Sequence, residues 1–225
     1  MHRVSGLVLV IGAVSFVVYV VIRSLLTSGV DPTVSASHAL WIPVNGLGFL
    51  GAMMVFIGLP AIYARVFAAT GLASLIGVVL TAAAWAFFGV FLTLYAALLL
   101  PWLAEEAPHL VAVGAPLPAA LMIAIATSLA AWLVGGVLLA LPFIRGRLKP
   151  TWIGYVFLAA ALWMLVGNLV IAPAGPSANV AANLVSNLGP VLLLIALANL
   201  GCRLWMQRPG SEIGAVDELT DEQAE

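Results

Sequence analysis

The chain has very few charged residues. Only 8% of its 225 residues are charged, against roughly 25% in an average soluble domain, whereas 64% are hydrophobic. Such a chain cannot cover its surface with polar groups in water, which excludes a soluble globular domain. Its apolar runs, about 20 to 25 residues long, suffice to cross a hydrocarbon core of roughly 30 Å and lack the alternation of barrel strands. We therefore predict an all-α integral membrane protein.

Cysteine and histidine are also scarce, and their positions exclude two kinds of site. The single cysteine, Cys202, rules out a disulfide framework and a multi-cysteine metal site. His2, His38 and His109 all lie at the edges of the apolar runs, so no histidine pair on facing helices is available to ligate a haem. We expect the lipid bilayer as a partner, and neither a cofactor nor a nucleic acid.

The apolar runs predict six membrane-spanning helices within one domain, residues 1–208. The expected spans are 4–26, 39–63, 70–99, 118–144, 152–172 and 179–204. The third run is longer than one crossing needs, so it either tilts strongly or leaves the membrane beyond Pro101. Residues 209–225 are rich in Asp and Glu and poor in apolar residues, which predicts a disordered acidic tail.

Lysine and arginine are distributed unequally between the two faces of this arrangement. Seven of the eight cationic residues fall on the face that both termini share, and only Arg23 falls on the other. Loops that carry an excess of Lys and Arg remain in the cytoplasm. We therefore predict a six-transmembrane-helix bundle with both termini in the cytoplasm.

Three stretches resemble a known group of proteins. The sequences GLPAIYAR (58–65), LPWLAEEAPHLV (100–111) and LPFIRGRLKPTWIGYVFL (141–158) are similar to segments of a family of small, uncharacterised multi-pass inner-membrane proteins of bacteria. The resemblance covers roughly the middle two thirds of the chain and rests on motifs rich in Leu, Ala and Gly. It implies a multi-pass topology in a bacterial inner membrane, and neither an activity nor a functional residue.

Polar residues are rare within the expected spans. Asp, Glu and Lys are absent from them, which argues against an ion-coupled carrier built around a buried carboxylate. Arg23 lies near a helix end, where its side chain can reach the interface. At a rise of 1.5 Å per residue, four asparagines fall within roughly 5 to 15 Å of the outer boundary. They are Asn45, Asn168, Asn183 and Asn187.

This asparagine layer has two interpretations. An amide exposed to lipid would cost several kcal/mol, so the side chains are expected to point into the bundle. There they either join helices by hydrogen bonds, at about 1 kcal/mol each, or line a cavity for a ligand. Pro43 and Pro190 lie close to the same layer and free backbone carbonyls, as the broken helices of binding sites do.

A second candidate site lies at the outer edge of the bundle. His38, Glu105, Glu106 and His109 offer imidazoles and carboxylates, which are zinc ligands and acid/base groups. Glu105 and His109 share a helix face only if the helix continues through Pro108. The spacing matches no metal motif, so hydrated loop residues are the alternative interpretation.

The leading functional hypothesis is a non-enzymatic protein with a polar cavity in its outer half. It would bind a ligand or lipid, or act as a sensor or partner subunit. The alternatives are a permease for a small neutral or lipid-like substrate, and a metal-dependent enzyme on the outer face. Small residues such as Gly48, Gly51 and Gly135 allow close contact within the bundle or between protomers, so a second copy or another membrane protein is a further expected partner.

Overall fold

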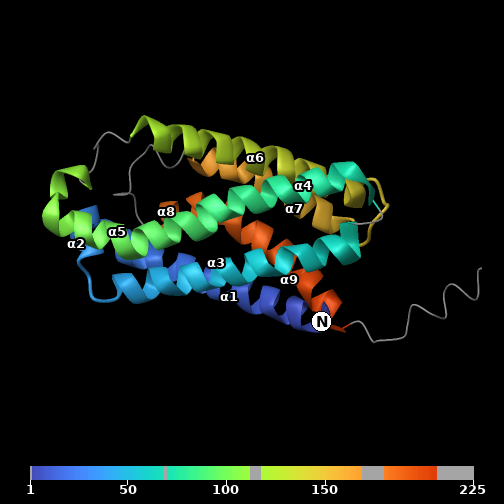
Figure 1. The fold of residues 1–225 in the computed structure, drawn as a ribbon, viewed down its shortest axis with the longest axis horizontal. Coiled ribbons are helices and arrows are strands. Elements are labelled where there is room, and N and C mark those ends of the chain that lie inside the picture. The colour runs from blue at the N-terminus through green and yellow to red at the C-terminus, as the bar shows by residue number, and fades with distance from the viewer. Residues whose placement is uncertain (1, 68–69, 112–117, 169–179, 207–225) are drawn as a thin grey trace, which may run out of the picture.

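The structure, a computed structural model, describes residues 2–67, 70–111, 118–168 and 180–206. Every regular element in these ranges is helical, which confirms the expected all-α class (Figure 1). The α-helices are α1 (His2–Thr27), α2 (Pro32–Ala36), α3 (Trp41–Ile62), α4 (Leu72–Trp85), α5 (Leu92–Glu106), α6 (Ala119–Ile144), α7 (Trp152–Val166), α8 (Val180–Ser186) and α9 (Leu188–Met206). The expected acidic tail lies outside the described residues.

Length and composition suit several of these helices to a membrane. Among the described residues, five segments are long and apolar enough to cross one: Val4–Thr27, Trp41–Ile62, Leu72–Glu106, Ala119–Ile144 and Leu188–Met206. The apolar helix α7 is shorter, with 15 residues, and the end of the fifth expected span lies outside the described ranges. Five apolar helices of this length are compatible with a multi-pass membrane protein.

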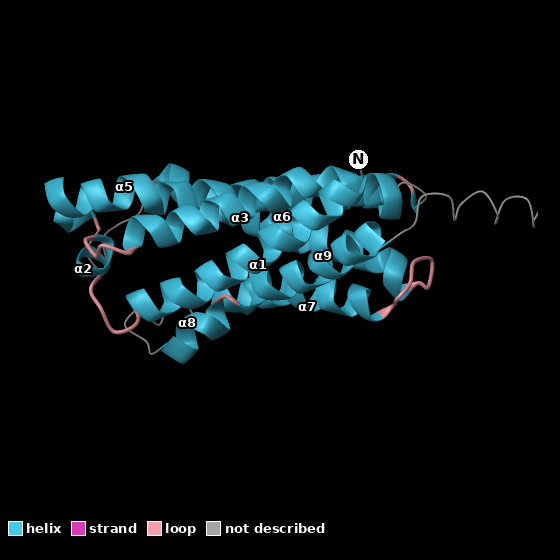
Figure 2. Ribbon diagram, turned by 90° about the horizontal axis from the view of Figure 1, so that it is seen from below, coloured by secondary structure: helices cyan, strands magenta, loops and turns pink. Residues whose placement is uncertain are grey.

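The long helices form a closed ring in which each contacts its neighbours in the sequence. The order is α1, α3, the rod made by α4, η3 (Ala86–Phe91) and α5, then α6, α7 and α9, which returns to α1. Figure 2 shows these helices running along one common axis. The short helix α2 packs against α5 at one end of the ring, the α2 end. At the opposite end, the terminal end, α1 begins and α9 finishes.

Among the described residues, π-helical turns occur within or at the ends of the long helices. The segment η1 (Tyr63–Phe67) extends α3, and η3 joins α4 to α5. A π turn disturbs the regular pairing of backbone amides with carbonyls. The hydroxyl of Thr93 donates to the carbonyl oxygens of Gly89 and Val90, so this part of the rod remains hydrogen-bonded. A 3-10 turn, η4 (Pro108–Leu110), follows α5.

Facing glycines bring three pairs of helices into close contact. The pairs are Gly6 with Gly201, Gly12 with Gly51 and Gly77 with Gly135. A Cβ atom at Gly6 would lie 2.6 Å from the carbonyl oxygen of Gly201, and one at Gly12 would lie 2.8 Å from that of Gly51. Side chains at these positions would therefore force α1 away from α9 and α3, so the small residues set the helix spacing.

Local sequence explains several helix ends. Gly29 follows α1 with a φ of 69°, and Gly146 follows α6 with a φ of 72°, a backbone region that favours glycine. Asp31 caps α2, since its carboxylate accepts a hydrogen bond from the Thr33 N–H at 2.8 Å. Pro32, which has no N–H to leave unpaired, occupies the start of α2.

Candidate functional site

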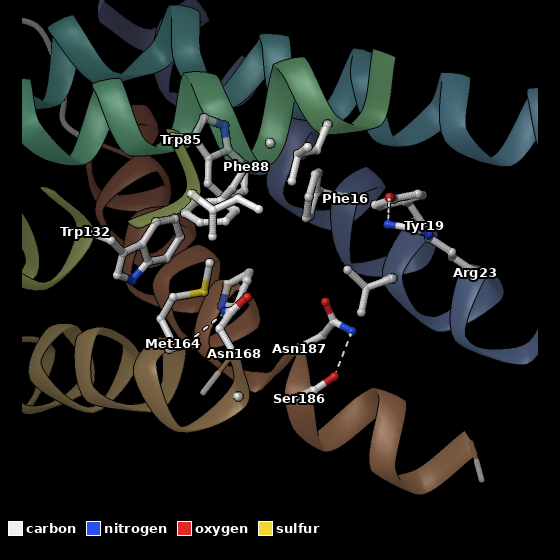
Figure 3. Close-up of a pocket in the computed structure, with 16 residues that line it drawn as sticks. Phe16, Tyr19, Arg23, Trp85, Phe88, Trp132, Met164, Asn168, Ser186 and Asn187 are labelled. Atoms are coloured by element: carbon white, nitrogen blue, oxygen red, sulfur yellow. Dashed lines mark hydrogen bonds between the residues drawn. The ribbon is translucent and has the colours of Figure 1, made fainter. Parts of the chain in front are cut away.

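A cavity of about 230 Å³, the central cavity, lies inside the ring. Residues of α1, the α4–η3–α5 rod, α6, α7 and the junction between α8 and α9 line it (Figure 3). Its aromatic lining consists of Phe16, Tyr19, Trp85, Phe88 and Trp132, and its polar lining of Arg23, Asn168, Ser186 and Asn187. The rings of Trp85, Phe88 and Trp132 lie on one side of the view, and the amides lie across from them.

The aromatic wall is a connected cluster. The ring centroids of Phe16 and Trp85 are 4.9 Å apart, and those of Trp85 and Trp132 are 6.1 Å apart. The indole N–H of Trp85 donates to the carbonyl oxygen of Ala52 on α3 at 3.0 Å, which fixes the ring across the bundle. The indole N–H of Trp132 has no acceptor among the described residues. These rings offer an apolar surface with one unused donor.

The amide wall is formed by Asn168 and Asn187. The side-chain nitrogen of Asn168 donates to the carbonyl oxygen of Met164 at 2.9 Å, and that of Asn187 donates to the carbonyl oxygen of Asn183 at 2.7 Å. Neither amide oxygen has a hydrogen-bond donor within the described part of the chain. Both amide groups point into the cavity in Figure 3. The wall therefore presents two free acceptors.

The break between α8 and α9 places Asn187 in this wall. Its backbone N–H is shared between the carbonyls of Asn183 and Leu184, at 3.3 and 3.1 Å. Pro190 has no N–H, so it cannot donate to Ser186 as a residue inside a helix would. Gly167 lies against the Ser186 carbonyl so closely that a Cβ atom there would overlap it. This contact brings α7, and with it the neighbouring Asn168, next to Asn187.

Arg23 lies in the wall of the cavity, near the end of α1. Its guanidinium donates to the hydroxyl of Tyr19 at 2.7 Å. The guanidinium carbon is 5.8 Å from the ring centroid of Tyr19 and 5.9 Å from that of Trp41. Two aromatic faces within about 6 Å stabilise a cation, so the side chain turns toward Tyr19.

A second pocket of about 230 Å³, the side pocket, adjoins the central cavity. Its boundary with the central cavity is made of Tyr19, Val20, Arg23 and Asn187, which line both. Ser24, Thr27 and Asn183 complete it. The amide nitrogen of Asn183 donates to the hydroxyl of Ser28 at 3.1 Å, which joins α8 to α1. The polar lining thus continues from the cavity toward the α2 end.

Three of the four predicted asparagines are brought together. Asn168 and Asn187 line the central cavity, and Asn183 and Asn187 line the side pocket. Asn45 lies in neither: it is fully buried, and its amide nitrogen donates to the carbonyl oxygen of Trp41 at 2.9 Å. Its buried amide oxygen has no donor among the described residues. A ligand-binding role for these residues stays a prediction.

Sequence reasoning missed Tyr19, Arg23 and the aromatic wall as a group. Tyr19 and Arg23 are four residues apart on α1, which places them on one helix face. Their polar ends in an otherwise apolar helix were a signal for an inward-facing pair. The aromatic residues gave no such signal, because large apolar residues are spread over every face of these helices.

The outer-edge candidates are not gathered around a common point. His38, Glu105, Glu106 and His109 are all exposed. Among the residues that the structure describes, no group of three or more His, Cys, Asp or Glu side chains could hold a metal ion. The helix α5 ends at Glu106 and a separate 3-10 turn holds His109, so Glu105 and His109 do not share a continuous helix face.

Asp31 is the titratable group at the α2 end with a resolved shift. The hydroxyl of Thr33, and then its backbone N–H, donate hydrogen bonds that lower the pKa of the Asp31 carboxyl below its ordinary value. The carboxylate is thus committed to capping α2.

Comparison of the chain with protein-family models, with curated proteins and with solved structures gave no match. None of these comparisons therefore supports the resemblance of residues 58–65, 100–111 and 141–158 to bacterial inner-membrane proteins. A functional proposal for this chain therefore depends on the geometry of the cavity.

Proposed function

We propose that this chain is a non-enzymatic integral membrane protein that binds a small amphipathic molecule in the central cavity. The observation that carries the proposal is the division of the lining into an aromatic wall and an amide wall with free acceptors. An apolar pocket with a few convergent polar groups is typical of a small-molecule site. The volume of about 230 Å³ lies below the roughly 300 to 1,000 Å³ of sites for drug-sized ligands, which favours a small ligand.

The hydrogen bonds of the asparagines favour a cavity over helix-to-helix joining. The amide nitrogens of Asn45 and Asn168 donate to carbonyls four residues earlier in their own helices, and that of Asn187 donates across one turn of the α8–α9 junction. Within the described ranges, Asn183 is the one of these four whose side chain donates to another helix, to Thr27 at the end of α1 and to Ser28 just after it. Residues kept for joining helices would be expected to bond across the interface.

The same proposal includes six crossings with both termini in the cytoplasm. The exposed cations Arg145, Arg147 and Lys149 follow α6, whereas Glu105 and Glu106 end α5 at the opposite end of the rod. The positive-inside rule then orients the terminal end inward. In a Cys202→Ser background, an impermeant thiol reagent applied to intact cells should label a cysteine at position 106 and not one at position 147. The reverse pattern would contradict this topology.

Ligand binding is measured by quenching of tryptophan fluorescence. Trp85 and Trp132 line the cavity, whereas Trp102, Trp152 and Trp205 are exposed and would report the surrounding detergent. The parent protein for the assay therefore carries phenylalanine at these three exposed positions. We expect 8-bromooctanol to quench its remaining fluorescence saturably, because bromine quenches an indole that it contacts. Quenching that rises linearly without saturation contradicts the proposal.

A pair of variants on α6 locates the bound molecule. Ile125 lines the cavity, and Ile123, two residues earlier, is 64% exposed. Ile125→Phe should fill the cavity and weaken binding of 8-bromooctanol at least about tenfold. The matched change Ile123→Phe should leave binding unchanged. Equal affinity of the two variants would place the probe outside the cavity.

A permease for a small neutral or lipid-like substrate is the second candidate. The observation that favours it is the side pocket, which continues the polar lining toward the α2 end. A permease would exchange substrate across both faces of the membrane. Transport is measured as uptake of a radiolabelled solute into proteoliposomes. The solute is a small polar molecule such as glycerol, because octanol crosses lipid without a protein. Faster uptake of labelled glycerol by proteoliposomes with the parent protein than by those with Ile125→Phe would favour transport.

A further inference from the structure

Arg23 brings a positive charge into the wall that the central cavity shares with the side pocket. A guanidinium has five N–H donors, and the Tyr19 hydroxyl accepts from one of its nitrogens at 2.7 Å. Within the described part of the chain, Arg23 makes no other side-chain hydrogen bond and no ion pair. Most of its donors are therefore free to bind a ligand.

Among the residues that the structure describes, no carboxylate pairs with this charge. The described carboxylates of Asp31, Glu105 and Glu106 are exposed, and that of Asp31 is bonded to Thr33. Asp and Glu are absent from the expected spans. A cation partly removed from water is stabilised by an anion, and guanidinium pairs with carboxylate or phosphate through two parallel hydrogen bonds. The missing anion can therefore come from a bound molecule.

Ser24 adds a second donor on the same side. It is 3% exposed and lines the side pocket beside Arg23. Its hydroxyl has no hydrogen-bond partner among the residues described here. This hydroxyl borders the side pocket and can donate a hydrogen bond, for which an anion held by Arg23 would supply an acceptor.

The two walls of the central cavity fix the direction of the ligand. The free amide oxygen of Asn168, which lines the central cavity but not the side pocket, would repel a negative charge, so the anionic group belongs on the side of Arg23 and Ser24. The aromatic rings of Trp85 and Trp132 would cover an apolar chain. The lining thus changes from cationic through polar to apolar along one path.

We infer that the site selects an amphiphile whose negatively charged head group, a carboxylate or a phosphate, binds Arg23 while its apolar chain lies against Trp85 and Trp132. This inference rests on the proposed function and specifies the class of ligand. Arg23 acts as the residue that distinguishes an anionic head group from a neutral one.

Two probes that differ only in the head group test the inference. In the assay described for 8-bromooctanol, 8-bromooctanoate at pH 8 presents a carboxylate on the same brominated chain. We expect the carboxylate to bind at least about tenfold more tightly than the alcohol, a difference of about 1.4 kcal/mol. Equal affinities would overturn the inference and leave the proposed function intact, whereas absence of saturable quenching by both probes would overturn the proposed function.

Three arginine variants assign the preference to one side chain. Arg23→Gln should abolish the preference for the carboxylate and retain binding of the alcohol, which shows that the protein is folded. Arg23→Lys should retain a preference for the carboxylate. Arg203→Gln is the matched control, because Arg203 is exposed near the terminal end and bonds to Asn199. Persistence of the full preference in Arg23→Gln would overturn the role of Arg23.

Competition separates the two sources of an anionic head group. A membrane lipid would bring a phosphate, and a free fatty acid would bring a carboxylate. Displacement of 8-bromooctanoate by short-chain phosphatidic acid but not by octanoate would assign the site to a lipid, and the opposite result would assign it to a free acid. Equal displacement by neutral octyl glucoside would contradict selection by charge.

Discussion

The terminal end of the ring and its centre are built from equally apolar helices, yet one is closely packed and the other is hollow. Toward the terminal end, Gly6 with Gly201 and Gly77 with Gly135 bring backbones together. In the centre, the large rings of Trp85 and Trp132 and the break at Asn187 accompany a cavity of about 230 Å³. Apolar composition alone therefore does not decide whether a helix bundle is solid or hollow. The size of the side chains and the regularity of the helices decide it.

The largest effect is expected where a large side chain would be inserted between the closely packed helices α1 and α3. A Cβ atom at Gly12 would lie 2.7 Å from the Cβ of Met54 and 2.8 Å from the carbonyl oxygen of Gly51. Gly12→Leu should therefore destabilise the protein by about 3 kcal/mol or more, because neither contact is with the end of a flexible side chain. Unfolding in mixed micelles of SDS and a nonionic detergent measures the loss. Gly46→Leu is the control, since nothing lies within 4 Å of a Cβ at Gly46.

A smaller effect is expected where close packing meets the cavity. Gly167→Ala would push the Ser186 carbonyl away from α7 and move the junction that carries Asn187. We expect a loss of about 1 to 2 kcal/mol in stability and weaker quenching by 8-bromooctanol. The same unfolding and fluorescence assays measure both. A loss of stability with unchanged binding of 8-bromooctanol would show that the position of the α8–α9 junction does not affect the site.

Two tryptophans within the cavity allow a finer comparison. Trp85→Phe removes the hydrogen bond to the Ala52 carbonyl, whereas Trp132→Phe removes an N–H that has no acceptor among the described residues. Both changes shorten an aromatic ring that is nearly fully buried. We therefore expect Trp85→Phe to cost about 1 kcal/mol more than Trp132→Phe in the unfolding assay. An equal or larger loss at Trp132 would indicate that its N–H is bonded.

The smallest effect is expected at the α2 end. The pKa of Asp31 is lowered in the folded protein, so its capping contribution is fully present above the pKa of the unfolded chain and is lost as pH falls through the folded pKa. The protection of the Thr33 amide, which is the intrinsic exchange rate divided by the observed rate at the same pH, should therefore fall at acidic pH. Asp31→Asn should remove this dependence, while Glu106→Gln should leave it unchanged. If the ratio of the Thr33 exchange rates in wild type and Asp31→Asn did not change with pH, the capping role of the Asp31 carboxylate would be contradicted.

The helical class could be predicted because it depends on composition and on the length of apolar runs. The expected segment 118–144 corresponds to α6 (Ala119–Ile144), whose flanking prolines and arginines mark its ends. The break at Asn187 was indicated by Pro190, which removes a backbone donor. The π turn η3 had no recognisable signal, because Ala86 and its neighbours would suit an ordinary helix equally well.

The site was predictable only in part, since polarity is visible in a sequence and distance is not. Asn168, Asn183 and Asn187 were found because amides are costly in lipid. Asn45 shares their expected depth but lies on α3, where its amide nitrogen bonds to its own helix. The position of Arg23 depended on the ring of Trp41, eighteen residues away, which no local pattern reveals.

The closure of the ring by α9 against α1 has a consequence for biosynthesis. Gly6 is made about 200 residues before its partner Gly201, which at roughly 5 to 20 residues per second is a delay of about 10 to 40 s. During that interval the flank of α1 that packs against α9 lacks this neighbour. Because α8 and α9 supply Ser186, Asn187 and Pro190 to the lining, the nascent protein has no complete cavity until α9 is in place.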